Sequence, residues 1–317
     1  MTFSKFVKYV LSVVLISILV VVTINVHINE FGLFGNVKGK PIRIYTEERT
    51  SKYLLSFNWI PQNFDAVLFG PSYSDIEMDT RKLEGLSVYN LSMNGANISE
   101  LKYPLENVIK SNRLKVIIVC LSPYLTKDSG KKTNAIDPRE YWSTLGSLFT
   151  LKYYLKKHLA LSDVDKDPFR DSWFGFRHNE YNVYENYDVK KEIEARHKQM
   201  VDGKYNIKID TKAIQELGDV LDLARMHDIK ILAYYYPAHK KIFETQQYQV
   251  EIKKYRSQVE ELLTPDDIVI DFNTEEFNYI RDDYETFSDG SHLSPVGGNR
   301  LIMVIQEFIN RHNLDTL

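Results

Sequence analysis

Five short, nearly continuous apolar runs alternate with segments of helical periodicity, and this alternation constrains the fold of the chain most. The runs are rich in β-branched or aromatic side chains and occupy residues 66–69, 87–91, 115–121, 230–235 and 268–272. Candidate helices occupy residues 98–111, 144–158, 211–227, 246–263 and 295–311. Near-continuous hydrophobicity is typical of strands that helices cover on both faces. The pattern predicts a three-layer α/β/α domain, doubly wound and flavodoxin-like, with a mostly parallel five-stranded sheet.

The N-terminal part of the chain predicts a membrane anchor. Residues 9–26 carry no charge and are dominated by Val, Ile and Leu, and such a stretch is long enough to cross the hydrocarbon core of a bilayer. A secretory signal peptide is the alternative, but residues 24–27 offer no small-x-small cleavage site. Lys5 and Lys8 precede the stretch, so the positive-inside rule predicts a cytoplasmic tip at residues 1–8. We expect a single-pass cell-membrane protein whose large C-terminal part is periplasmic or extracellular.

The segment after the anchor divides into a stalk and one folded domain. Residues 27–40 contain three glycines and show little periodicity, which is typical of a connecting stalk. The domain is expected at residues 41–317, with an insertion at about residues 126–206 that is crowded with Tyr, Trp, Phe and Asp. Such an insertion is either a lid or binding region, or an additional layer that only packs.

Charge and metal-ligand spacing exclude two classes of function. The net charge is -3 at pH 7, and no dense Lys/Arg run is interleaved with aromatic residues, so we expect no nucleic-acid partner. The eight histidines are scattered and the single cysteine, Cys120, lies in an apolar run. Because no paired His or Cys spacing is present, we predict no metal and no cofactor.

A serine follows the first predicted strand. Gly70 and Pro71 precede Ser72, which places the hydroxyl on a tight turn at the edge of the sheet where the ligand crevice of this fold lies. A serine on such a turn is a candidate nucleophile, and its own backbone N–H can face an incoming carbonyl oxygen. The alternative is a plain Gly-Pro turn in which Ser72 caps the next helix.

A second polar motif precedes the last helix. Asp289 stands three residues before His292, and Ser294 with Pro295 gives a sound helix start. An aspartate at this spacing can orient an imidazole whose other nitrogen faces a serine. The alternative is a helix-capping loop with an incidental histidine.

Polar turns follow the other strands at the same edge. Gly95 lies in a turn after the second strand, and a missing side chain lets backbone N–H groups approach a ligand. Asn94 and Asn97 flank it, and Ser122 follows the third strand. The ends of the third and fourth strands also carry the two candidate substrate-binding residues, Tyr124 and His239. A structural role for His239 is the alternative.

These residues resemble the SGNH, or GDSL-like, hydrolases. That family carries a nucleophilic serine after the first strand and an Asp-x-x-His pair before the last helix, which Ser72, Asp289 and His292 match. The resemblance implies an oxyanion hole formed by the N–H groups of Ser72 and Gly95. The family's asparagine after the third strand is absent, so Asn94, Asn97 or Ser122 is expected to substitute for it.

The anchor and this departure resemble the extracytoplasmic branch that modifies cell-surface polymers, which includes alginate O-acetylation proteins and the D-alanyl transfer protein of teichoic acid. The resemblance implies serine-dependent O-acyl transfer to a polysaccharide, or hydrolysis from it. Expected partners are a glycan or acyl-glycan substrate and a membrane protein that donates the acyl group. Two alternatives remain open: a non-catalytic scaffold of a polysaccharide assembly or export complex, and a lipase with a wide apolar crevice. Sugar-stacking and core packing are both open for the aromatic residues of the insertion, among them Tyr141, Trp142, Trp173, Phe174 and Phe176.

Overall fold

The computed structural model describes residues 2–40, 48–127, 136, 141, 144–145, 147–148, 151–152, 155, 170–171, 173–177, 188–204 and 208–316. Most of the helix predicted at residues 144–158, and Trp142, lie outside these residues.

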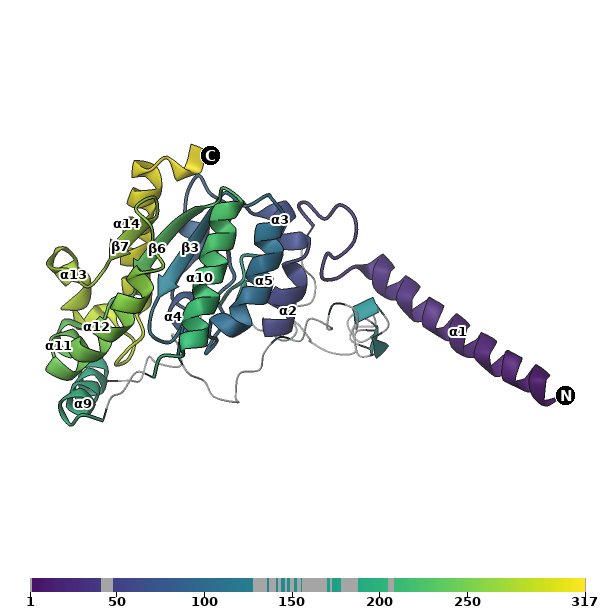
Figure 1. Cartoon of the computed structure of the whole chain (residues 1–317), viewed down its shortest axis with the longest axis horizontal. Helices are drawn as coiled ribbons and strands as arrows, with labels where there is room; N and C mark the ends of the chain where they lie inside the picture. Colours follow the sequence, from purple (N-terminus) through teal and green to yellow (C-terminus); the bar gives the residue numbers. More distant parts are fainter. Residues whose placement is uncertain are drawn as a thin grey trace.

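A five-stranded parallel sheet forms the centre of the domain (Figure 1). Its strands lie in the order β2-β1-β3-β6-β7, and all four neighbouring pairs are parallel. Their bounds are Ala66–Phe69 (β1), Val88–Asn90 (β2), Val116–Leu121 (β3), Lys230–Tyr235 (β6) and Ile268–Asp271 (β7). In register, Leu68 of β1 lies between Asn90 and Ile118. The predicted fold class and all five predicted strands are confirmed.

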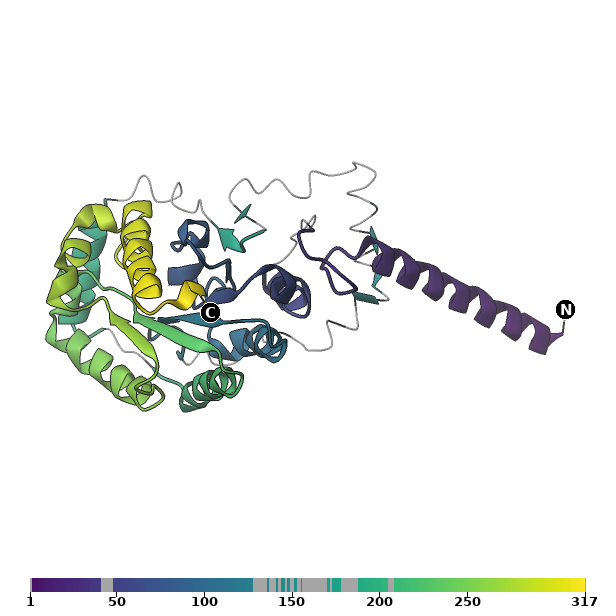
Figure 2. The ribbon, with the colours of Figure 1, turned by 90° about the horizontal axis from the view of Figure 1, so that it is seen from above.

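Helices cover both faces of the sheet, as Figure 2 shows from above. One buried apolar cluster contains Val67 and Phe69 with the helices α2 (Glu48–Leu55), α3 (Trp59–Asn63), α5 (Ile98–Lys110), α10 (Thr211–Met226) and α12 (Gln246–Glu260). The other contains Ala66 and Leu68 with α9 (Val189–Val201) and α14 (Pro295–Arg311). Alternate residues of β1 therefore face opposite layers, which explains why the whole strand is apolar.

Short helices connect the larger elements. The α-helical turns are α4 (Ser72–Asp75), α11 (Lys240–Phe243) and α13 (Asn278–Arg281). The 3₁₀ turns are η1 (Thr80–Lys82), η3 (Glu275–Phe277), η4 (Tyr284–Thr286) and η5 (Leu314–Thr316).

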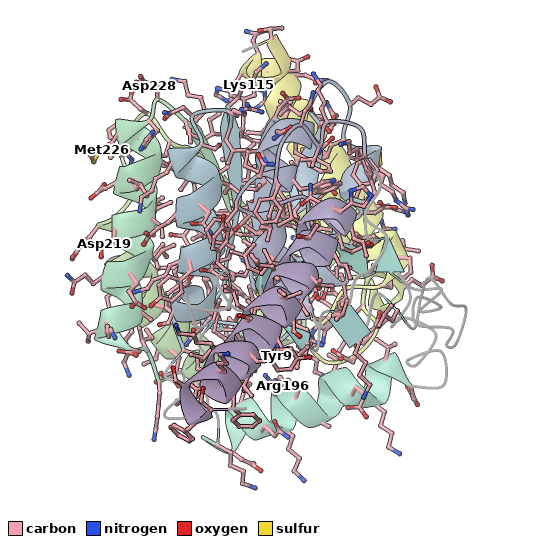
Figure 3. The ribbon with its side chains drawn as sticks, turned by 90° about the vertical axis from the view of Figure 1, so that its right-hand side faces the viewer. Tyr9, Lys115, Arg196, Asp219, Met226 and Asp228 are labelled. Atoms are coloured by element: carbon pink, nitrogen blue, oxygen red, sulfur yellow. The ribbon has the colours of Figure 1, made fainter. Side chains whose placement is uncertain are left out.

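The carboxyl ends of the strands meet at one edge, which is lined by α9. Figure 3 places Lys115 and Asp228, which precede β3 and β6, at one end of the molecule. Arg196 of α9 lies at the opposite end. The end of the insertion therefore contributes to the edge where this fold binds ligands.

The first helix, α1 (Phe3–Ile28), projects away from the domain (Figure 1). At a rise of about 1.5 Å per residue its 26 residues exceed the roughly 30 Å of a bilayer core. Its apolar side chains are exposed from Phe3 to Val20, and the hydroxyls of Ser17 and Thr23 bond to helix carbonyls one turn earlier. By length and composition α1 is able to cross a membrane.

The segment expected as a stalk packs on the domain instead. Phe31 and Val37 belong to the core cluster that contains α2 and α3. The backbone N–H of Val37 donates to Gln62 at 2.9 Å, and Trp59 donates its indole N–H to the Lys40 carbonyl at 2.8 Å. The loop thus covers α3, and the folded part begins about ten residues earlier than the glycine-rich composition indicated.

Part of the insertion forms a hairpin at the sheet edge. Strands β4 (Arg170–Asp171) and β5 (Phe176–Arg177) pair with each other, and the N–H of Asn90 in β2 donates to the Phe174 carbonyl at 2.8 Å. The hairpin therefore contacts the carboxyl end of β2, the edge strand of the sheet, at Asn90.

The described aromatic residues of the insertion pack against the domain. Trp173 lies edge-on to Trp59 with ring centroids 5.1 Å apart, and Tyr141 lies 4.6 Å from Phe57. Phe174 contacts Phe64 at 5.8 Å, and Phe176 is buried. For these four residues the packing alternative holds, since none of them lines the pocket at the carboxyl edge of the sheet.

Candidate active site

Ser72 and His292 meet at the carboxyl edge of the sheet. The Ser72 hydroxyl oxygen lies 3.0 Å from Nε2 of His292. Ser72 begins α4 after the two-residue turn that follows β1, and His292 lies in the loop before α14. The structure therefore brings together the two ends of the chain that the sequence assigned to one site.

Asp289 completes a continuous line of hydrogen bonds. Its Oδ2 lies 2.9 Å from Nδ1 of His292, and its Oδ1 accepts the backbone N–H groups of Ser291 and His292 at 2.6 and 2.7 Å. Burial alone raises the pKa of Asp289, but these hydrogen bonds and the His292 charge outweigh burial and hold the pKa at about 2. The ionised carboxylate accepts only, so Nδ1 carries the proton and Nε2 is free to take one from Ser72.

The turn before Ser72 requires close packing. A side chain on Gly70 would meet Cβ of Cys120 in β3 at 2.6 Å. The absence of a side chain lets the turn lie directly on β3, and the short helix that follows presents Ser72 in a half-buried position.

Cys120 is fully buried, and burial raises its thiol pKa to about 12. The thiol is therefore unreactive, and Cys120 has a packing role.

A buried tyrosine and glutamate support the histidine loop. The Tyr236 hydroxyl accepts the Leu293 N–H at 3.0 Å and lies 2.6 Å from a Glu77 carboxylate oxygen to which it donates. Burial raises the pKa of Glu77 well above its usual range. The Tyr236 ring also stacks on Tyr73 at 4.2 Å. The loop that carries His292 is therefore fixed to the turn that carries Ser72, a contact that no sequence motif indicated.

Gly95 lies in the loop that follows β2, beside the serine turn. The Met93 N–H donates to the Gly70 carbonyl at 3.2 Å, which joins the two loops. Gly95 has φ +68° and is exposed, with open space where a side chain would stand. Among the described residues neither the Ser72 nor the Gly95 N–H has a hydrogen-bond acceptor, so both amides are available to a ligand.

The three further oxyanion candidates differ in availability. Asn97 is buried and forms a capping box with Glu100 at the start of α5, so its side chain is committed to the helix. Asn94 donates its backbone N–H to Glu48 at 3.3 Å. Ser122 is buried and its hydroxyl has no partner among the described residues. The Ser122 hydroxyl therefore has no competing hydrogen bond among the described residues, whereas the structure shows Asn97 in a helix-capping role.

A buried charge cluster on α2 holds the turn that carries Ser72 and the loop that carries Gly95. Lys52 is fully buried; its Nζ lies 2.9 Å from Asp75 of α4 and 3.2 Å from Glu48, and it also donates to the Ser92 carbonyl. Burial, followed by the nearby Glu48 carboxylate, raises the pKa of Asp75 to about 8. A helical pattern predicts that charged residues lie on the exposed face. The buried positions of Lys52 and Asp75 could therefore not be predicted from the sequence.

Arg49 of the same helix fixes one peptide group. Its Nη2 donates to the Asn94 carbonyl at 2.9 Å and its Nε donates to Glu100 at 2.8 Å. The Asn94 carbonyl and the Gly95 N–H belong to one planar trans peptide and point in opposite directions. By holding the carbonyl, Arg49 therefore sets the direction of the Gly95 N–H.

Both predicted substrate-binding residues line a pocket beside the site. The pocket reaches from Tyr73 and Ser291, the neighbours of the reacting pair, to Tyr124 and His239. The Tyr124 hydroxyl lies 3.2 Å from Arg196 of α9 and its ring contacts Tyr73 edge-on. The described residues contain no group of three metal-ligating side chains.

Comparisons with known proteins identify no family. No family model matches the chain, and no curated protein matches it. One solved structure, provisionally named a platelet activating factor from Streptococcus pneumonia, aligns with 12% sequence identity and a TM-score of 0.45, over 83% of this chain and 91% of that chain. Similarity at this level carries no argument about activity.

Proposed function

We propose that the protein is a serine-dependent esterase or O-acyltransferase of the SGNH kind. The observation that supports this most is the hydrogen-bonded line from Ser72 through His292 to Asp289 at the carboxyl edge of the sheet. Nucleophile, base and orienting carboxylate stand within hydrogen-bond reach of one another, which is the geometry that acyl transfer requires.

The chemistry follows from the positions of the protons. His292 Nε2 takes the Ser72 proton as the oxygen attacks an ester carbonyl carbon, and the carbonyl electrons move onto the oxygen. Collapse of this intermediate breaks the bond to the alcohol, which receives the proton from His292 and leaves an acyl group on Ser72. Water or a sugar hydroxyl then gives its proton to His292 and attacks the acyl group, and His292 returns that proton to the Ser72 oxygen as the bond to the acyl group breaks.

The developing oxyanion needs donors in place before reaction. We assign this role to the N–H groups of Ser72 and Gly95, with the Ser122 hydroxyl as a third donor. Removal of one such donor typically raises the barrier by about 3 kcal/mol. The rigid support of Gly95 through Arg49 is consistent with this role.

We propose a substrate outside the cytoplasm. Lys5 and Lys8 before α1 favour a cytoplasmic N-terminus by the positive-inside rule, and this orientation would bring the domain close to polymers that are assembled at the membrane. We propose O-acylation or deacylation, of acetyl groups above all, on a cell-surface polysaccharide, with a membrane protein as acyl donor. This proposal follows the resemblance to extracytoplasmic proteins that modify cell-surface polymers.

Mass spectrometry of surface polymers tests this assignment. Cells that lack the protein should differ in polymer acyl content from cells that express it, and the Ser72→Ala variant should not restore the wild-type content. A gain of acyl groups on deletion identifies an esterase, and a loss identifies a transferase. Restoration by Ser72→Ala would instead support the scaffold alternative, which the absence of the family's asparagine after the third strand motivates.

A further inference from the structure

The apolar helix α1 contains one buried polar side chain in the turns that adjoin the domain (Figure 1). This side chain is Asn25, and its Nδ2 donates to the backbone carbonyls of Thr144 and Leu145 at 2.9 and 3.0 Å. An amide in hydrocarbon is costly unless it finds such partners. The two hydrogen bonds therefore join the insertion to the last turns of α1.

The length of α1 gives the depth of this contact in a bilayer. No Asp, Glu, Lys or Arg stands between Lys8 and Glu30, and at about 1.5 Å per residue the residues 9–28 extend about 30 Å, which is the thickness of a hydrocarbon core. Asn25 stands about 5 Å before the end of that span. The two carbonyls that it binds therefore lie at the boundary between acyl chains and headgroups.

The part of the insertion that follows these carbonyls carries exposed leucines. Leu148 is 70% exposed and Leu155 is 48% exposed, Leu151 is half-buried and Lys152 is exposed. All four are helical, and the Leu151 N–H donates to the Ser147 carbonyl one turn earlier at 3.0 Å. Side chains spaced by three, four and seven residues lie on one side of a helix. We call this surface, formed by residues 148, 151, 152 and 155, the leucine face.

Charge and packing favour a lipid surface as the partner of the leucine face. Residues 141–162 contain three lysines and no Asp or Glu, a composition that anionic headgroups attract. Lys152 can lay its methylene stem along the leucines while its ammonium group stays among the headgroups. Tyr141 packs on Phe57 with ring centroids 4.6 Å apart. The start of the segment is thus held on the domain while the leucine face stays exposed.

We propose that the leucine face is a second membrane contact, which lies in the headgroup region of an anionic bilayer beside the point where α1 leaves it. The two contacts hold the domain against the bilayer, whereas a single helix would let it rotate. The inference takes α1 as the membrane span. It goes beyond the proposed function, because it does not depend on the reaction at Ser72.

Fluorescence quenching by nitroxide-labelled lipids tests this contact. The full-length protein is placed in vesicles of phosphatidylcholine and phosphatidylglycerol that contain a lipid with its nitroxide near the headgroup. Because Cys120 is fully buried, an NBD maleimide dye reacts with a cysteine introduced by Leu148→Cys or Leu155→Cys, and wild type gives the background. We expect the dye to lose about half of its fluorescence at either position, since an interfacial helix face lies within the zone that the nitroxide reaches.

Two further positions are the controls for depth. Met226 is 79% exposed and lies on α10, which α5 and α2 separate from α1 in Figure 1, so the dye on Met226→Cys should keep nearly all of its fluorescence. Leu15→Cys lies within α1 and should be quenched by a nitroxide deep in the acyl chains. Quenching at Leu15 with none at Leu148 and Leu155 overturns the proposal and leaves the anchor in place. No quenching at Leu15 removes the span on which the proposal rests.

A matched pair of charge variants locates the effect. Leu155→Glu, combined with the dye on Leu148→Cys, should reduce the quenching to the value at Met226, because a carboxylate resists entry into the interface. Val201→Glu adds the same charge at another apolar residue, which is 65% exposed and belongs to α9, and should leave the quenching at Leu148 unchanged. Quenching that persists in Leu155→Glu, or falls equally in both variants, would contradict a contact made by the leucine face.

Discussion

The Ser72 hydroxyl lies 3.0 Å from Nε2 of His292, although 220 residues separate the two in the chain. The contact exists because β1 and the loop before α14 end at the same edge of a parallel sheet. Tyr236 strengthens it, since its ring stacks on Tyr73 while its hydroxyl binds the Leu293 N–H. The pair is thus held by the fold itself.

Replacement of Asp289 tests the orientation of the histidine. In Asp289→Asn the amide no longer requires a proton on Nδ1, so part of the His292 population has its proton on Nε2 and cannot accept from Ser72. We expect kcat on a small acetyl ester to fall by about 10²–10⁴-fold with little change in KM. An activity within a factor of about two of wild type would show that Asp289 has no such role.

Replacement of Asn97 tests whether this residue caps helix α5 or donates to the oxyanion. Loss of its capping box in Asn97→Ala should lower the free energy of unfolding by about 1 kcal/mol and leave kcat within about twofold. Asn97→Ser, which retains a capping oxygen, should recover most of the stability. A fall in kcat of about 10²-fold or more in Asn97→Ala would restore Asn97 to the oxyanion hole.

Arg49 is predicted to act as a positioning residue. Lysine cannot hold the Asn94 carbonyl and the Glu100 carboxylate together, so Arg49→Lys should loosen the peptide that carries the Gly95 N–H. We expect kcat to fall by about tenfold while KM and the melting temperature change little. If the melting temperature falls and kcat is preserved, the two hydrogen bonds of Arg49 stabilise the fold and do not position the Gly95 N–H.

The buried Asp75 predicts a pH dependence of stability. Because its folded-state pKa is raised from 3.8 to about 8, the native state binds a proton that the unfolded state has lost between these values. Its contribution is therefore fully present below pH 3.8 and is lost as pH rises through about 8. We expect the free energy of unfolding, measured with urea on the full-length protein in micelles, to fall more between pH 5 and pH 8 in wild type than in Asp75→Asn. Equal declines in the two proteins would contradict a buried, protonated Asp75.

The sheet and the reacting residues were predictable because their signals are local. An apolar run such as residues 115–121 is itself the mark of a strand with two covered faces. Parallel topology then places the residues after each strand at one edge, which is why Ser72 and His292 were expected to meet.

The supporting contacts were not predictable, because they join residues to distant backbone groups. Lys52 looks like a surface residue of an amphipathic helix, yet it bonds to Asp75 and to the Ser92 carbonyl in the interior. No sequence pattern indicates which backbone carbonyl a distant side chain will reach. The same limit applies to residues 31–37, whose glycines indicated a stalk although Val37 is buried.

Labelling of Ser72 by a fluorophosphonate probe tests the central claim most directly. In the full-length protein in micelles we expect one covalent adduct, assigned to Ser72 by peptide mass spectrometry, and its loss in both Ser72→Ala and His292→Ala. Ser74→Ala, which changes a buried neighbour on the same short helix, is the matched control and should retain the adduct. Equal labelling of wild type and Ser72→Ala would contradict the account.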